Sequence, residues 1–248
     1  MARGWPPLGL IVLPLTAHRS RERSRDHERP GITDARWRAG NRRGWAAVGW
    51  GLQQPRPRCD DRLAEPGKPE LRDWLDGDGT GVEAGSFSQA AEHGDVVLLA
   101  VLGDAAEAAI AEAGAENFSG KVVIDAMNPL DFSAGFPPRL SISGEDSLGE
   151  RVQRALPDAK VVKAFNTIGN QYFVDPSFSG GEPTMLIAGN DEHAKRLVRD
   201  LLADFGWSDT VDIGGIEGSR ELEAICIAWV KIGGARGAWD HGFKLLVG

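Results

Sequence analysis

Three short segments place polar side chains directly after runs of apolar residues. They are AVLG at residues 100–103, DAMNPLD at 125–131 and KAFNTIGN at 163–170. Ligands of open α/β sheets bind beyond the carboxyl ends of the strands. If the apolar runs are neighbouring strands of one sheet, these three segments meet at the edge where a ligand would bind, and we take them as the candidate site.

The first two segments offer a backbone and an amide to a ligand. Gly103 has no Cβ and lets a ligand approach the chain closely, and a helix starting at Asp104 would begin with free N–H groups. Asn128 carries an amide that both donates and accepts, and Pro129 biases the preceding backbone away from helix. A nicotinamide ribose or carboxamide suits these groups, although ordinary turns explain them about equally well.

The third segment carries Asn166 and Thr167 where an apolar run ends. Either side chain can contact a cofactor ring or substrate, or simply cap the next turn. Lys163 is a charged residue inside the run, and two interpretations stay open for it: a lysine exposed at a sheet edge, or a ligand contact.

No acid-base or nucleophile motif accompanies these segments. The five histidines have no clear partner, and no GxSxG sequence occurs. Cys59 and Cys226 are the only cysteines and lack the spacing of a metal site. We therefore assign no catalytic residue and no metal ligand. Such a site fits hydride transfer, in which cofactors carry the chemistry and the protein orients them.

The elements that must position the site alternate between strand and helix after Gly67. Apolar runs at 95–102, 121–126 and 160–165 have the length of strands buried on both faces of a parallel sheet. A helix-start signal stands before the first run, at Ser86 with Gln89, and two more stand between the runs, at Asp104 with Glu107 and at Ser147 with Glu150. This alternation predicts right-handed βαβ units and a mainly parallel α/β sheet with helices on both faces.

The pattern continues toward the C-terminus. Strands are predicted at 184–188 and 210–213, with a helix between them that Asn190 caps and Gly206 ends. A final helix carries one apolar stripe, which we expect to be core or subunit interface, at Leu222, Ile225, Trp229 and Ile232.

Residues 1–66 differ sharply from the rest. They hold 13 arginines, no lysine and 7 acidic residues, a net charge of +6, and since the whole chain carries −8 the remainder carries −14. Read one base later, codons compatible with QQPRPRCDDRLAEP at 53–66 can spell SSRGHDVTIGSRNP, which looks like the second strand of a dinucleotide-binding fold. One hypothesis is a frameshifted, irregular or disordered segment that replaces the first βαβ unit. The alternative is a genuine Arg-rich extension.

Composition argues against several function classes. A basic segment on an acidic globule is typical of nucleic-acid binding, but four tryptophans in residues 1–66 are unusual for a basic tail, so we expect no nucleic-acid partner. No stretch approaches the ~20 apolar residues that cross a bilayer. The run at 8–15 contains Pro14 and lacks a clear cleavage site. We expect a cytoplasmic protein without a membrane partner.

Four stretches carry a family resemblance: VVIDAMNPLDF, DSLGERVQRALPDAKVVKAFNT, AGNDEHAKRLVRDLLADFGW and DIGGIEGSRELEAICIAWVKIGGARGAWDHGFKLL. Together they look like the NADPH-dependent F420 reductases and related F420-dependent NADP oxidoreductases, from Lys68 to Leu246. The resemblance implies a Rossmann-type NAD(P)-binding domain at 67–215, incomplete in its N-terminal half, and a small helical region at 216–248. The family's glycine loop and strand-2 serine–arginine pair are absent from the sequence as written.

The resemblance also implies a function and a set of contacts. The implied activity is hydride transfer between NADP(H) and a small redox co-substrate, either coenzyme F420 or a flavin-like acceptor, by a possible homodimer. The alternatives are a non-catalytic NADP(H)-binding regulatory domain, or an inactive product that lacks the glycine loop. We expect substrate contacts at Asn166 and Thr167. Cofactor contacts are expected at Ala100, Val101, Leu102, Gly103, Ala105, Asn128, Pro129 and Ala164.

Overall fold

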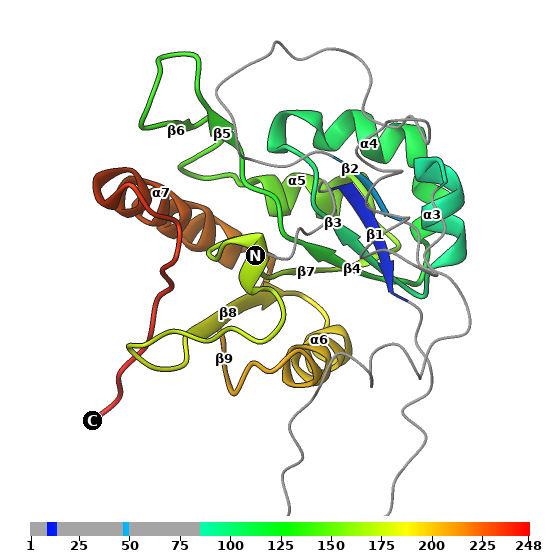
Figure 1. Cartoon of the computed structure of the whole chain (residues 1–248). Helices are drawn as coiled ribbons and strands as arrows, with labels where there is room; N and C mark the ends of the chain where they lie inside the picture. Colours follow the sequence, from blue (N-terminus) through cyan, green and yellow to red (C-terminus); the bar gives the residue numbers. More distant parts are fainter. Residues whose placement is uncertain (1–8, 14–46, 50–84) are drawn as a thin grey trace, which may run out of the picture.

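Three parallel strands form the centre of the sheet in the computed structural model, which describes residues 9–13, 47–49 and 85–248. The three are β3 (Val96–Leu99), β4 (Val122–Asp125) and β7 (Lys160–Lys163). Strand β4 lies between the other two and is parallel to both (Figure 1). The strands are largely buried because helices cover both faces of the sheet. The predicted α/β class with a parallel central sheet is confirmed.

Further strands extend the sheet on both sides, in the order β2-β1-β3-β4-β7-β8-β9. Strand β8 (Thr184–Gly189) is antiparallel to β7, and β9 (Asp209–Asp212) is parallel to β8. On the other side β1 (Gly9–Leu13) is antiparallel to β3, and β2 (Ala47–Gly49) is antiparallel to β1. The strands β8 and β9 were predicted, but the reversals of direction were not.

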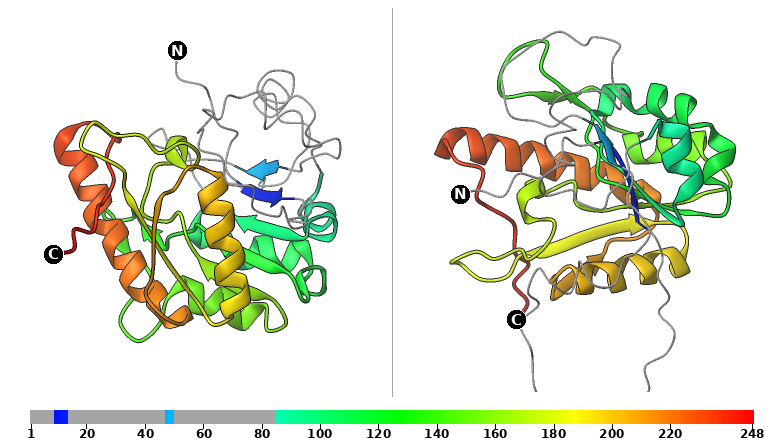
Figure 2. Two further views of the ribbon diagram at one scale, coloured as in Figure 1. Left: turned by 90° about the horizontal axis from the view of Figure 1, so that it is seen from below. Right: turned by 45° about the vertical axis from the view of Figure 1, so that its right-hand side comes forward.

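Helices and a small hairpin connect the strands (Figures 1 and 2). The helices are α3 (Phe87–His93), α4 (Ala106–Ala113), α5 (Leu148–Ala155), α6 (Glu192–Asp204) and α7 (Ser219–Arg236). Single 3-10 turns are η1 (Gly103–Ala105), η2 (Ala115–Phe118), η3 (Asn170–Tyr172) and η4 (Ile216–Gly218). The hairpin pairs β5 (Leu130–Asp131) with β6 (Arg139–Leu140).

Two apolar cores lie on opposite faces of the sheet. On one face Val123 and Val161 pack with residues of α3, α4 and α5. On the other face Ile124 and Val162 pack with Val198 and other residues of α6. Alternate residues of a strand point to opposite faces, so Asp125 and Lys163 share the face of α5.

The helix starts confirm some predicted caps and correct others. Ser86 and Gln89 form the predicted capping box of α3, and Ser147 caps α5. Helix α4 instead begins after the η1 turn, without a side-chain cap hydrogen bond. The cap of α6 is Asp191 rather than Asn190, whose Oδ1 accepts the backbone N–H of Ile216. The start of α4 was mispredicted because a turn of 3-10 helix precedes the α-helix. The cap of α6 was mispredicted because two residues that can cap a helix, Asn190 and Asp191, are adjacent.

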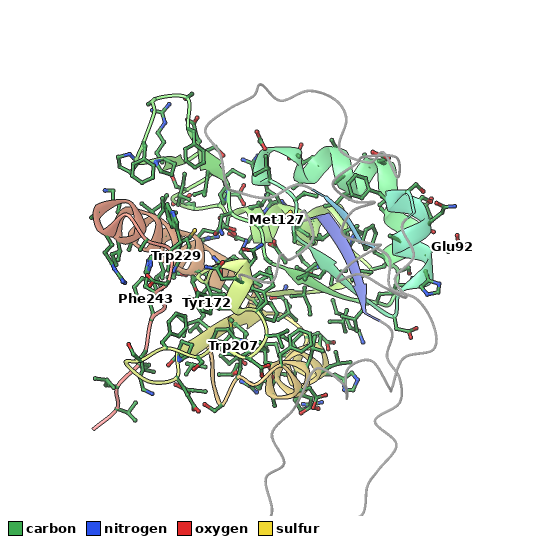
Figure 3. All side chains as sticks on the ribbon, in the orientation of Figure 1. Glu92, Met127, Tyr172, Trp207, Trp229 and Phe243 are labelled. Atoms are coloured by element: carbon green, nitrogen blue, oxygen red, sulfur yellow. The ribbon has the colours of Figure 1, made fainter. Side chains whose placement is uncertain are left out.

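Helix α7 buries a different stripe from the predicted one. Of the predicted stripe, Leu222 is completely buried, but Ile232 is 39% exposed. Glu223 and Cys226, which were not predicted to face the core, are buried. After α7 the chain turns back along the sheet, and Thr184 donates its backbone N–H to the carbonyl of Phe243 (Figure 3). Within the described ranges, no helix is both long enough and apolar enough to span a membrane.

The boundary expected near Gly67 and most of the segment at 1–66 lie outside the described residues. The exceptions are β1 and β2, which belong to the sheet. Loss of a first strand would leave the edge of β3 unpaired, whereas β1 pairs with that edge. The hypothesis of a shifted reading frame concerns the coding sequence and stays a prediction.

Candidate functional site

A buried ion triad lies where β4 and β7 end. The Nζ of Lys163 is 3.0 Å from Asp125 Oδ2 and 2.8 Å from Glu223 Oε1, and all three side chains are at most 1% exposed. Burial disfavours the charged ammonium, but the two carboxylates outweigh it and raise the pKa of Lys163. Lys163 is therefore a cation enclosed by two acidic partners. The interpretation of Lys163 as a lysine exposed at a sheet edge is wrong, and the ligand contact stays a prediction.

The triad holds the loop that follows β4. Lys163 Nζ donates to the carbonyl oxygen of Met127 at 2.6 Å, and the N–H of Met127 donates to Asp125 Oδ1 at 2.9 Å. Met127 lies between the central strands and α7 (Figure 3). Both backbone polar groups of Met127 are thus fixed by charged side chains, one residue before Asn128.

Glu223 also joins α7 to α5. Its carboxylate accepts the first backbone N–H groups of α5, from Leu148 and Gly149, each at 3.1 Å. A carboxylate at a helix N-terminus satisfies free donors and interacts favourably with the helix dipole. A methyl group on Gly149 would lie 2.2 Å from Ser219 Oγ, so the approach of the two helices requires glycine there.

A strained residue turns the chain after β7. Phe165 has φ +63°, a left-handed conformation that is a genuine outlier for a bulky side chain. Its ring packs against Phe173 with centroids 4.6 Å apart and edge-on to Trp207 at 6.4 Å. The aromatic packing holds the turn, and the next residue is Asn166.

Two asparagines form the polar centre of the site. Asn128 Nδ2 donates to the backbone carbonyl of Asn166 at 2.8 Å, and Asn166 Nδ2 donates to Asn128 Oδ1 at 2.9 Å. Asn166 Nδ2 also donates to the carbonyl of Leu222 on α7 at 2.9 Å. The side chain of Asn166 is 4% exposed, yet its Oδ1 has no hydrogen-bond partner. A buried, unpaired amide oxygen is costly, and a ligand N–H would satisfy it.

Gly103 serves packing between two loops. A Cβ at this position would lie 2.2 Å from the carbonyl oxygen of Asn128 and 2.8 Å from the Cα of Pro129. The turn after β3 therefore lies directly against the loop after β4. The absence of a side chain at Gly103 is explained by this contact, whether or not a ligand also approaches.

The structure brings most of the predicted site residues to one edge of the sheet. Gly103, Asn128, Pro129 and Asn166 contact or adjoin one another there. The remaining predicted residues follow the same strands but differ in access: Leu102 is 40% exposed, Ala105 is half-buried, Ala100, Val101 and Thr167 are buried, and Ala164 is completely buried. Ala164 and the Oδ1 atom of Asn166 are both enclosed in this structure, and contact of either with a ligand stays a prediction.

Sequence reasoning missed the carboxylate partners of Lys163. Glu223 sits beside Leu222 in a helix of mixed polarity, where a glutamate ordinarily faces solvent. One signal was available: a lysine in a central strand needs a buried counter-charge, and Asp125, at the end of the neighbouring strand, was a candidate for it. The second carboxylate comes from a helix 60 residues away from Lys163, which no local pattern indicates.

Comparison with known proteins gives a consistent relationship. The family described as NADP oxidoreductase, coenzyme F420-dependent, matches residues 62–129. The F420-dependent NADP reductase of Methanocaldococcus jannaschii is 34% identical over 137 residues, which are 55% of this chain and 60% of that protein. The enzyme of that name from Methanothermobacter marburgensis is 31% identical over 58% of this chain and 65% of its own length.

A solved structure extends the similarity over more of the chain. A protein from Arthrobacter sp. FB24, provisionally named an F420-dependent NADP reductase, is 36% identical with a TM-score of 0.68, covering 76% of this chain and 86% of that one. The chain belongs to the F420-dependent NADP oxidoreductase family. A hypothetical protein from Sinorhizobium meliloti is also similar, at 34% identity and a TM-score of 0.51 over 60% of this chain and 70% of its own.

The family match begins at residue 62, close to the compositional change at Gly67. It runs through the turn at Gly103 and ends at Pro129, so it contains the first polar segment and residues 125–129 of the second. The chain spans less than two thirds of the curated family members' own length. Lys163, Asn166 and Glu223 lie beyond the family match. Asn166 was predicted from the sequence, and the link between the three comes from their contacts in this structure.

Proposed function

We propose that this protein is an oxidoreductase that passes a hydride between NADP(H) and coenzyme F420 or a flavin-like acceptor. The curated relatives are named F420-dependent NADP reductases, and family membership extends that activity to this chain as a proposal. The observation in the structure that supports it best is the unpaired, buried Oδ1 of Asn166 at the carboxyl edge of the central strands.

The chemistry of this atom suits a nicotinamide. The ring's carboxamide offers N–H donors, and Asn166 Oδ1 is an acceptor that the protein itself leaves unpaired. Asn128 is half-buried and makes two hydrogen bonds to Asn166, one donated to its backbone carbonyl and one accepted from its side-chain amide. These two asparagines would hold the nicotinamide end, and the turns at Gly103 and Asn128 would line the adjoining part of the cofactor.

The cofactors would supply the hydride chemistry, and the protein would position them. Asn166 would fix the orientation of the carboxamide, and the buried surroundings of Ala100, Val101 and Thr167 would exclude water. No proton donor is assigned among the described residues. The cytoplasmic location and the homodimer remain parts of this proposal, and sedimentation velocity of the purified chain tests the second.

Anaerobic turnover measurements test the proposal. The intact chain is mixed with NADPH and, in separate reactions, with oxidised F420 and with FMN, and oxidation of NADPH is followed by absorbance. We expect steady oxidation with F420, and a loss of about tenfold in kcat/KM for Asn166→Ala, since one hydrogen bond to a buried unpaired group is removed. Asn117→Ala is the control, because Asn117 bonds to Ser88 and Ala113 at the opposite edge.

Saturable NADPH binding without turnover on any acceptor would contradict the enzyme and favour a regulatory nucleotide-binding domain. Turnover with FMN but not with F420 would assign the acceptor to the flavins. Equal losses in Asn166→Ala and Asn117→Ala would remove Asn166 from the site.

A further inference from the structure

Lys163 is the centre of a buried group of three charges. It is completely buried between Asp125 and Glu223. Replacing such buried ion groups by apolar residues of similar volume is often neutral or stabilising, so a buried ion triad is weak support for stability as such. A role in fixing geometry is an alternative reason for its presence.

The contacts of Lys163 converge on the neighbours of the two site asparagines. On one side its Nζ binds the carbonyl of Met127, which directly precedes Asn128. On the other side it binds Glu223, which directly follows Leu222, the residue whose carbonyl accepts from Asn166. One ammonium group therefore links the loop after β4 and helix α7, the two elements that supply the partners of the Asn166 side chain.

We propose that Lys163 is a positioning residue that sets the geometry of the Asn128–Asn166 pair. Through Met127 it fixes the loop that carries Asn128, and through Glu223 it fixes the turn of α7 that carries the Leu222 carbonyl. With both anchored, the Nδ2 of Asn166 is occupied by protein acceptors and its Oδ1 is left for the ligand. The ligand's identity rests on the proposed function, but the geometry does not.

A second buried lysine provides a matched control. Lys195 on α6 is 5% exposed and also binds two carboxylates, Glu192 at 2.7 Å and Asp212 at 2.9 Å. Helix α6 packs on the opposite face of the sheet from α5. Loss of Lys163 removes the cation shared by two buried carboxylates, whereas after loss of Lys195 Asp212 keeps Arg199 at 3.2 Å. Only Lys163 is connected to the asparagine pair.

The test uses the intact, ligand-free chain labelled with ¹⁵N on asparagine. Proton exchange of the side-chain amides is measured by NMR in the wild type, Lys163→Met and Lys195→Met, with signals assigned by single Asn→Asp variants. We expect exchange at the Asn166 amide to accelerate about tenfold or more in Lys163→Met, because its acceptors are no longer held. Lys195→Met should leave this rate within about twofold.

A triple variant keeps the test decisive where Lys163→Met does not fold. Asp125→Asn, Lys163→Met and Glu223→Gln together remove all three charges at nearly constant volume, so no uncompensated charge is left buried. Met127 still loses its donor, so the Asn166 amide should again exchange faster. A folded single or triple variant in which the Asn166 rate equals that of the wild type would overturn the role of Lys163.

Calorimetric titration with NADPH adds a second readout. We expect the dissociation constant to rise about tenfold in Lys163→Met, as for loss of one well-placed hydrogen bond, and to be unchanged in Lys195→Met. Equal affinities of the wild type and a folded Lys163→Met would overturn the positioning role. If the wild type binds no NADPH, the proposed function fails, while the exchange rates still decide whether Lys163 positions the pair.

Discussion

Gly103 is the residue at which the turn after β3 touches the loop after β4. The backbone of Asn128 and Pro129 occupies the space that a side chain would need. The sequence suggested that Gly103 lets a ligand approach the backbone, but the packing of the protein itself already requires glycine at this position. The two roles are compatible, since this contact places the turn beside Asn128.

Gly103→Ala should lower the free energy of unfolding by about 1–3 kcal/mol, the usual cost of forcing atoms into a filled space. Gly180→Ala is the matched control, because no atom lies within 4 Å of a Cβ built there. It should be neutral or slightly stabilising. Urea unfolding of both variants measures the difference, and equal stabilities would contradict the close approach at Gly103.

Cys226 should be inert in the folded protein. Burial is the main cause that raises the pKa of its thiol to about 12, so only about one thiol in ten thousand is ionised at pH 8. In a Cys59→Ser variant, which leaves one cysteine, a thiol reagent at pH 8 should label the protein only after denaturant is added. Rapid labelling of the native variant would show that Cys226 is accessible.

At the level of elements, α5 and α7 are joined by an ion pair in addition to Glu223. Arg220 contacts both carboxylate oxygens of Glu150, with Nε 2.8 Å from Oε2. The hydrogen bond from Arg220 is the largest cause of the lowered pKa of Glu150. The pair therefore holds the start of α7 against the first turn of α5, next to the triad.

Arg220→Gln should destabilise the protein at pH 7 by about 1 kcal/mol, a modest value because Arg220 is 36% exposed. The folded-state pKa of Glu150 lies below its ordinary value of about 4.3. The pair is thus fully stabilising above that value, and its contribution is lost as the pH falls through the lowered pKa. Denaturant titrations should show the gap between wild type and variant closing below about pH 4.

Arg139→Gln serves as the control for this pair, since Arg139 is 68% exposed beside Asp131. It should change stability by less than about 0.5 kcal/mol. A gap for Arg220→Gln that stays constant down to acid pH would contradict the assigned ion pair.

The elements also show what the sequence could and could not predict. Strands β3, β4 and β7 are continuous apolar runs and were predicted with their parallel order, because that pattern reflects burial on both faces. The antiparallel pairing of β8 with β7 was not predicted, because the direction of a strand depends on the path of the connecting loop rather than on composition. Asn166 was found because it ends a strand; Glu223 was missed because its partner Lys163 is distant in sequence.

At the scale of the whole molecule, residues 1–66 differ in composition from the rest of the chain. The glycine loop expected of a dinucleotide site would supply backbone N–H groups for the pyrophosphate, and it is absent from residues 1–66 as written. A version with the one-base shift repaired should therefore bind NADPH far more tightly than this chain. Calorimetric titration of both proteins measures this, and equal affinities would refute the frameshift account.

The central claim is that the carboxyl edge of β3, β4 and β7 holds the nicotinamide cofactor. NMR of the asparagine-labelled chain during titration with NADPH tests the location directly, before any turnover. The side-chain amide signals of Asn128 and Asn166 should shift together and saturate, while that of Asn117, at the opposite edge beside Ser88, stays in place. A titration in which Asn128 and Asn166 do not move, or in which Asn117 moves instead, would contradict the assignment of this edge as the site.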